Sequence, residues 1–231
     1  MNFLSHYYFD RQTSSLRIMG SLLPDFIKNA GKFKIESPLK QPEKYSEPGI
    51  NEIYLGWKNH IIIDKLFHSS DFFYEQTQRI KEKIQPITEG TEIRPSFLAH
   101  ISLELMLDHL LIKYNHLHVQ DLYTALQTAP KETIIEFLNL CRVESPETVM
   151  NFLNNFTSSK YLISYQKTAN IAYALNRICM RVWPEGMEKQ KIDELHDQID
   201  QYIAENETEL LKIFNVMALE LSNYKNKNLR Q

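Results

Sequence analysis

The sequence is poor in glycine and cysteine and carries little net charge. Its 231 residues include six glycines, too few to suggest many tight hairpins or a glycine-rich phosphate-binding loop. The two cysteines, Cys141 and Cys179, do not make a disulfide framework. Each lies in an apolar helical pattern, so we expect two reduced core residues. The formal net charge of -3 argues against a nucleic-acid partner held by bulk electrostatics.

Targeting and membrane-spanning patterns are also missing. The opening residues MNFLSHYYFD have neither the basic start nor the long apolar run of a signal peptide. No apolar stretch reaches the roughly 20 residues that are needed to span a bilayer. We therefore expect a cytoplasmic protein without a membrane partner.

Helical periodicity is present along most of the chain, and no alternating pattern predicts a strand. We expect one all-α domain, a multi-helix bundle over residues 1–225, and a frayed polar tail over 226–231. Gly20 predicts a break and Pro24 a turn, with a new helix starting at Asp25. Ser145 predicts the N-cap of another helix. The predicted helices also cover residues 2–10, 49–84, a stretch opened by Pro95, 119–128, 130–141, 146–157, 159–182 and about 186–224.

One long segment interrupts the helices. Residues 31–48, GKFKIESPLKQPEKYSEP, contain three prolines and little apolar periodicity. A segment of this length without secondary structure is uncommon in a compact domain. We therefore expect residues 31–48 to be either a mobile surface flap or a functional element.

A pattern of possible metal ligands begins in the stretch HIIIDKLFH, residues 60–68. His60, Asp64 and His68 follow one another at intervals of four residues. A helix turns about 100° per residue, so the three side chains share a face, although about 12 Å of axial rise separates the first from the last. Two ligands one turn apart are a common way for a helix to hold a metal ion. The spacing therefore predicts ligand pairs.

A second helix repeats this spacing with His100, Glu104 and Asp108, and His109 follows directly. An aspartate among leucines is costly to bury unpaired, so we expect a metal ion or a hydrogen bond from a neighbouring histidine at Asp108. Glu104 has the alternative interpretation of a solvated partner one turn from His100.

His6 and Asp25 add two further side chains of the ligand class. Imidazole and carboxylate together suit Mn, Fe or Zn, with Mg where oxygen ligands dominate, and helical bundles often hold such ions in their cores. A histidine on a helix is more often exposed or hydrogen-bonded than a ligand. We prefer that interpretation for His116, His118 and His196, and also for His68 and His100.

Several motifs give the chain a resemblance to a known family. MNFLSH at the start, GSLLPDF, H-x-x-x-D at 60–64 and LDHLL at 107–111 occur in the order and rough spacing of the bacterial acyl carrier protein phosphodiesterases. YLISYQ and ALNRICMR resemble the C-terminal helices of that family. The resemblance runs from residue 1 to about residue 220, and it implies an all-helical fold similar to the HD-domain phosphohydrolases, with a His/Asp metal centre.

The resemblance implies a phosphoric diester hydrolase of lipid metabolism and fatty acid biosynthesis. Its substrate would be holo-acyl carrier protein, cleaved at the bond between 4′-phosphopantetheine and a serine to give apo-carrier protein. The family depends on a divalent cation, with Mn favoured and Mg or Fe as alternatives. Matching positions imply that Asp25, His60, Asp64 and Asp108 are the metal ligands.

Phosphodiester hydrolysis also needs proton transfer and a positive charge at the phosphate. His6 and His109 fit the proton transfer by residue type. Arg181, and Arg177 one turn earlier, fit the clamp on the phosphate. An acidic carrier protein could dock on the lysines of the long segment and its flank, although a solvated loop is the simpler interpretation. These lysines are Lys28, Lys32, Lys34, Lys40 and Lys44.

The chain departs from the family pattern beside the H-x-x-x-D motif. Ile61 stands where the family usually has an arginine, and Phe67 and His68 stand where it has a Thr-Asp pair. A basic residue beside a phosphate stabilises its negative charge, so its replacement keeps two alternatives open. One is a metallophosphohydrolase of a small phosphate ester or nucleotide. The other is a catalytically inactive helical module that binds a carrier protein.

Overall fold

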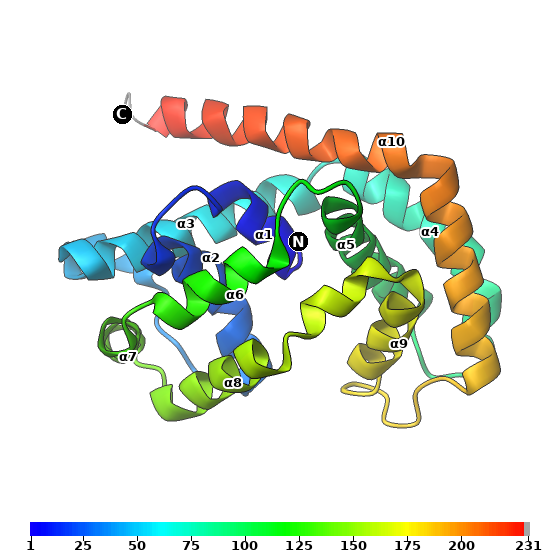
Figure 1. The fold of residues 1–231 in the computed structure, drawn as a ribbon, viewed down its shortest axis with the longest axis horizontal. Helices are drawn as coiled ribbons and strands as arrows, with labels where there is room; N and C mark the ends of the chain where they lie inside the picture. Colours follow the sequence, from blue (N-terminus) through cyan, green and yellow to red (C-terminus); the bar gives the residue numbers. More distant parts are fainter. Residues whose placement is uncertain (229–231) are drawn as a thin grey trace. The chain divides into compact units, whose positions relative to one another are not determined.

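The computed structural model describes residues 1–228, and this part of the chain is all α-helical, which confirms the predicted fold class (Figure 1). The α-helices are α1 (Phe3–Asp10), α2 (Ser15–Ala30), α3 (Pro48–His68), α4 (Asp71–Thr88), α5 (Pro95–Lys113), α6 (Val119–Thr128), α7 (Lys131–Leu140), α8 (Pro146–Ser159), α9 (Thr168–Cys179) and α10 (Lys189–Asn228). Three short 3-10 segments are η1 (Pro38–Lys40), η2 (Pro42–Tyr45) and η3 (Tyr161–Gln166).

The chain forms two compact units, and neither is one continuous stretch of sequence. Unit 1 contains Met1–Ser5, Lys65–His116 and the chain from Ser164 on, and unit 2 contains His6–Asp64 and Leu117–Ile163. Each unit therefore depends on pairing between helices that are distant in the sequence.

Unit 1 is built around α5. This helix packs against α4, α9 and α10, and most of its residues between Leu98 and Ile112 are buried. By length and composition α5, with 19 residues, could cross a membrane, although the sequence predicted no membrane-spanning stretch. However, 67% of its apolar window is buried inside the protein, as expected for the core helix of a soluble protein. Its apolar character on every side follows from this central place.

Unit 2 is built around α2, which packs against α6 and α8. The predicted break at Gly20 and turn at Pro24 are wrong, because α2 runs through both residues. Gly20 is instead a point of close approach, since a Cβ atom there would collide with the backbone of Ile53 in α3. Gly56 of α3 lies equally close to the backbone of Arg17. The two glycines let α2 and α3 come close together.

Two long predicted helices are each divided in the structure. The predicted helix 49–84 is α3 and α4, separated at Ser69 and Ser70, where the Ser70 hydroxyl accepts a hydrogen bond from the Phe73 N–H at 3.1 Å. Ser70 followed by Asp71 is an N-cap signal, and the prediction missed it because the helical periodicity continues across it. The predicted helix 159–182 is η3 followed by α9, which ends at Cys179.

Other boundaries match the prediction well. The predicted helix 119–128 is α6, Pro95 begins α5, and the Ser145 hydroxyl accepts a hydrogen bond from Thr148 N–H at the start of α8. At the C-terminus α10 continues to Asn228, so the predicted polar tail begins inside a helix. Residues 229–231 of that tail lie outside the described residues.

The long segment 31–48 is attached to unit 2 at more than one point. Tyr45 is only 2% exposed, and its hydroxyl lies 3.6 Å from the Cys141 sulfur. The Glu36 N–H donates to the Cys141 carbonyl at 2.8 Å. Cys141 and Cys179 are both free and buried, which confirms their predicted place in the core.

Candidate metal centre

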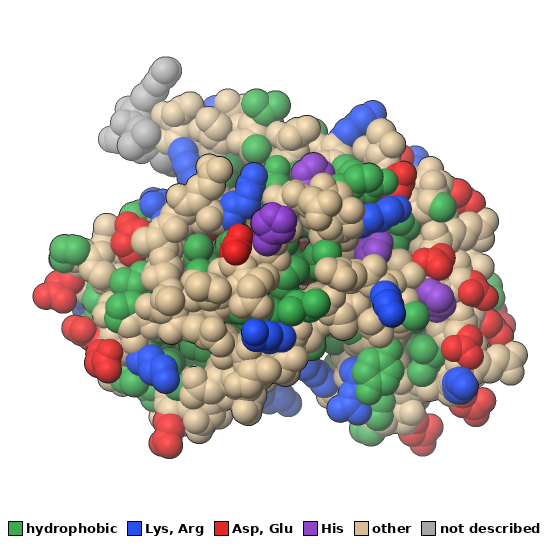
Figure 2. Space-filling view, in the orientation of Figure 1, with side chains coloured by type: hydrophobic (Ala, Val, Ile, Leu, Met, Phe, Trp, Pro, Cys, Tyr) green, Lys and Arg blue, Asp and Glu red, His purple; other side chains and the backbone are tan. Residues whose placement is uncertain are grey.

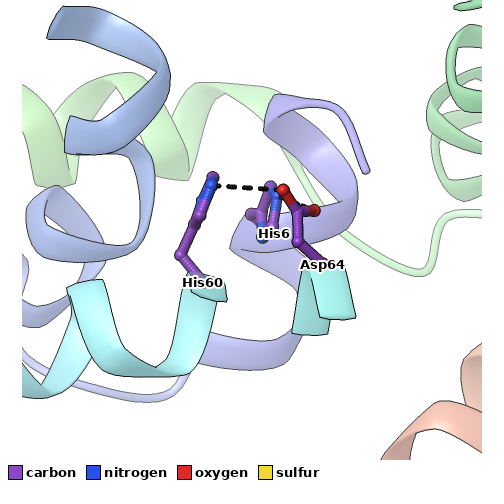
Figure 3. A group of neighbouring side chains, drawn as sticks. All are labelled: His6, His60 and Asp64. Atoms are coloured by element: carbon purple, nitrogen blue, oxygen red, sulfur yellow. Dashed lines mark ion pairs between the residues drawn. The ribbon is translucent and has the colours of Figure 1, made fainter. Parts of the chain in front are cut away.

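Helices α1 and α3 bring His6, His60 and Asp64 together in unit 2 (Figure 3). One ligand atom from each residue lies within 4.8 Å of the other two. Asp64 Oδ1 is 3.2 Å from His6 Nε2, and Asp64 Oδ2 is 3.5 Å from His60 Nε2. The pair at 60 and 64 has the one-turn spacing that the sequence predicted, and His6 of α1 supplies the third group.

His6 is the most unusual member of this cluster. Its side chain is fully buried, and neither ring nitrogen has a hydrogen-bond partner. Burial, reinforced by the nearby His60, lowers the pKa of His6 to about 3, so the ring is neutral at pH 7. A buried imidazole without hydrogen bonds is costly, unless a group that the protein binds compensates for it.

His60 is oriented for ligation by its second nitrogen. Its Nδ1–H donates a hydrogen bond to the carbonyl of Ser21 at 2.8 Å, so the Nε2 lone pair remains available on the side of Asp64. Metal-binding histidines usually donate their other N–H to a carbonyl or carboxylate in this way. The hydrogen bond from α3 to α2 therefore selects the tautomer that a metal site requires.

Asp64 supplies the negative charge. Burial acts to raise the pKa of Asp64, but the close approach of His6 Nε2 holds it well below its usual range. The carboxylate is 32% exposed, so a side of the cluster is open to solvent. Two imidazoles and one carboxylate suit a divalent ion such as Mn, Fe or Zn. The residues present therefore fit the metal that the sequence predicted.

Two other predicted ligands do not belong to this cluster. Asp25, on α2, is half-buried and lies outside the group of close ligand atoms. Asp108, on α5 in unit 1, is fully buried. For both residues, metal ligation stays a prediction.

Asp108 accepts hydrogen bonds at the N-terminus of α1. Its Oδ1 accepts from Ser5 N–H at 2.8 Å and from the Ser5 hydroxyl at 2.7 Å. Its Oδ2 accepts from Leu4 N–H at 3.1 Å and from the Asn2 side chain at 2.9 Å. Burial raises the pKa of Asp108 to about 7, although these hydrogen bonds act to lower it. The expected hydrogen bond from a neighbouring histidine is therefore wrong: α1 supplies the donors, and no local pattern in the sequence reveals that pairing.

The predicted proton-transfer residue His109 is anchored to the backbone. It is 5% exposed, and its Nδ1–H donates to the carbonyl of Tyr165 at 2.7 Å within unit 1. Burial lowers the pKa of His109, against the effect of this hydrogen bond. The predicted phosphate clamps Arg177 and Arg181 also lie in unit 1, at the end of α9 and just beyond it, and both are exposed.

Charges of both signs are present on the face drawn in Figure 2. On the face drawn in Figure 2, basic and acidic side chains are interspersed, in keeping with a formal net charge of -3. The five lysines between Lys28 and Lys44 are all exposed. A partner attracted by charge would therefore need a local patch such as this lysine-bearing segment of unit 2.

Comparison with known proteins gives one result. A family profile described as "Acyl carrier protein phosphodiesterase" matches residues 1–217. No curated protein and no solved structure matches the chain. The matched range includes the whole cluster of His6, His60 and Asp64, and it extends into α10.

Proposed function

Because the chain belongs to the acyl carrier protein phosphodiesterase family, we propose that it is a metal-dependent phosphodiesterase of holo-acyl carrier protein. The reaction is hydrolysis of the phosphodiester between 4′-phosphopantetheine and a serine of the carrier protein. Its products are apo-carrier protein and phosphopantetheine. The observation that carries the metal dependence is the convergence of His6, His60 and Asp64, with both nitrogens of His6 buried and without a hydrogen bond.

The three clustered side chains are the proposed metal ligands. A divalent ion held there would polarise a phosphoryl oxygen and lower the pKa of a water molecule. His6 acts as a neutral ligand in this proposal and not as the proton carrier that its residue type first suggested. His60 is held in position by Ser21, and the Asp64 carboxylate balances part of the ionic charge. The family resemblance favours Mn, with Mg or Fe as alternatives, and keeps Asp25 and Asp108 as further ligand candidates.

Proton transfer and phosphate binding fall to other residues. The Nδ1–H of His109 is engaged by Tyr165, so its remaining nitrogen is the one that could accept a proton. Arg177 and Arg181 are proposed to stabilise phosphate charge, a role for which their guanidinium groups are suited. The exposed lysines from Lys28 to Lys44 are the proposed docking segment for an acidic carrier protein. The proposal places the reaction in the cytoplasm.

One observation supports a second candidate. Ile61, next to His60, is 38% exposed and offers no positive charge where the family usually has an arginine. A smaller phosphate ester or nucleotide is therefore the alternative substrate. A catalytically inactive carrier-binding module is the third possibility, and it differs from both enzymes by showing no hydrolysis.

The test is a mass measurement on the carrier protein. Holo-carrier protein is incubated with metal-free enzyme and then with enzyme supplied with Mn, and loss of the phosphopantetheine group is followed. We expect release only with metal, and loss of activity in His60→Ala. His118→Ala is the matched control, because His118 is an exposed histidine of unit 2 outside the cluster. Cleavage of small phosphate esters alone would support the second candidate, and metal binding without any hydrolysis would support the third.

A further inference from the structure

A second group of metal-ligand side chains lies in unit 1 and has no part in the proposed function. His68 is the last residue of α3, and His100 and Glu104 lie one turn apart on α5. The Nε2 atoms of His68 and His100 are 3.1 Å and 3.0 Å from the same oxygen, Glu104 Oε1. One ligand atom from each residue lies within 4.8 Å of the other two.

The spacing of these atoms is close to that of a metal site. In a tetrahedral site with bonds of about 2.0–2.1 Å, two neighbouring ligand atoms are about 3.3 Å apart. The two nitrogen-to-oxygen distances of 3.0 Å and 3.1 Å therefore need only small side-chain movements to admit an ion. His100 and Glu104 form the one-turn pair that helices use to hold metals, and His68 adds a ligand from a different helix.

The two imidazoles are held by aromatic packing. Phe73 of α4 meets both rings edge-on, with centroids 4.9 Å from His68 and 4.9 Å from His100. The two imidazole centroids are 5.0 Å apart. This packing limits the rotation of both rings, so the cost of ordering them on an ion is already reduced.

Charge and access also suit a cation. Burial acts to raise the pKa of Glu104, but the Met1 amine and the hydrogen bonds of His100 and His68 hold it well below its usual range, so the carboxylate is ionised. The Met1 amino nitrogen is 3.1 Å from the same oxygen, so an ion must compete with it. The side chains of His68 and His100 are 32% and 41% exposed, which leaves a route for an ion from solvent.

We propose that His68, His100 and Glu104 form a second metal site, which binds a divalent transition-metal ion such as zinc. Two histidines and a glutamate are a ligand set that zinc uses in proteins. An ion there would join the end of α3 to α5 beside Phe73. Its existence does not depend on phosphodiesterase activity, because none of its residues belongs to the cluster of His6, His60 and Asp64.

The test counts bound ions in full-length protein. Metal-free wild type and His60→Ala are loaded with zinc or cobalt, and stoichiometry is measured by native mass spectrometry and by cobalt absorption. We expect His60→Ala to retain one ion, and this ion to bind at least about tenfold more weakly after the additional change His68→Ala or His100→Ala. Both histidines are partly exposed, so we expect these variants to fold, and thermal unfolding verifies that they do.

His196→Ala is the matched control. His196 pairs with Asp200 one turn away at 3.3 Å, yet no third ligand-class side chain joins that pair in the described chain. Loss of metal in this variant, or retention of the ion with unchanged affinity in His68→Ala and His100→Ala, would overturn the second site. If the number of bound ions is unchanged but no phosphopantetheine is released, the result counts against the proposed function and not against the second site.

Discussion

The imidazole rings of His6 and His60 are stacked, with centroids 3.8 Å apart and planes inclined by 17°. Two protonated imidazoles would repel each other strongly at this separation. The stack therefore excludes two protonated rings, in keeping with the pKa of about 3 to which burial and His60 bring His6. The neutral ring of His6 beside the Asp64 carboxylate is in the protonation state that a metal ion requires.

The first prediction concerns the cost of His6 in the metal-free protein. We expect His6→Leu to raise the free energy of unfolding without metal by about 1 kcal/mol, because apolar atoms replace two buried nitrogens that make no hydrogen bond. The same change should weaken metal binding in the His6, His60 and Asp64 cluster. Denaturant unfolding in the presence of a chelator measures the first effect, and metal titration measures the second. A less stable variant would show that the imidazole is compensated in the metal-free protein.

The second prediction separates two roles for Asp108. We expect Asp108→Ala to lower the free energy of unfolding by about 2–4 kcal/mol, because it leaves the buried N–H groups of Leu4 and Ser5 without an acceptor. Asp108→Asn should cost less, since it keeps one acceptor oxygen. Unfolding curves measure these changes, and the metal content of the folded variants is determined in parallel. Loss of a metal ion with little loss of stability would identify Asp108 as a ligand instead.

The third prediction concerns the close approach of α2 and α3. We expect Gly20→Ala and Gly56→Ala each to destabilise the protein by about 1–3 kcal/mol, since the new methyl group would force the backbones apart. The better helix propensity of alanine offsets part of this cost. Gly49→Ala is the control on α3, because its Cβ would meet only side-chain atoms, of Thr133 at 3.2 Å and of Leu16 at 3.5 Å. Equal thermal stability of all three variants would contradict the interpretation of Gly20 as a packing residue.

Local signals in the sequence were sufficient for much of the fold. Periodicity alone placed α6, and Pro95 and Ser145 marked the starts of α5 and α8. The failures have a common physical cause. Gly20 and Pro24 were interpreted as helix breaks from their local conformational preferences alone. In the structure, the identity of Gly20 is explained by its close approach to the backbone of Ile53 in another helix.

The candidate site was predictable where it depends on helical spacing. His60 and Asp64 were identified as a one-turn pair, and the structure brings them together. His6 was expected to carry protons by its residue type. A single sequence does not show that α1 places its imidazole beside His60 and Asp64 with both nitrogens buried. The hydrogen bonds of Asp108 to Leu4 and Ser5 connect positions more than 100 residues apart, and no spacing rule detects them.

The fourth prediction concerns the cysteines. Burial raises the pKa of Cys141 and of Cys179 to about 11 each, against a reference of 9.0. At pH 8 this shift alone reduces the reactive thiolate about 100-fold, because each pKa unit is a factor of ten. We expect a thiol reagent to label native protein at least that much more slowly than denatured protein, with a rate that keeps rising up to about pH 11. A native rate that levels off near pH 9 would mean that the thiols are exposed to water.

The fifth prediction tests the docking segment. If Lys32 and Lys34 attract an acidic carrier protein, Lys32→Glu combined with Lys34→Glu should raise KM for holo-carrier protein several-fold and leave kcat little changed, since neither lysine lies in the metal cluster. Raising the ionic strength from 0.01 to 1 M shortens the screening length from about 30 to about 3 Å, so the wild type should lose its advantage at high salt. The control reverses the charge of Lys58 and Lys65, exposed lysines of α3 outside the segment. An equal rise in KM in the control would assign the effect to net charge, and an unchanged KM in both variants would exclude the segment as a docking surface.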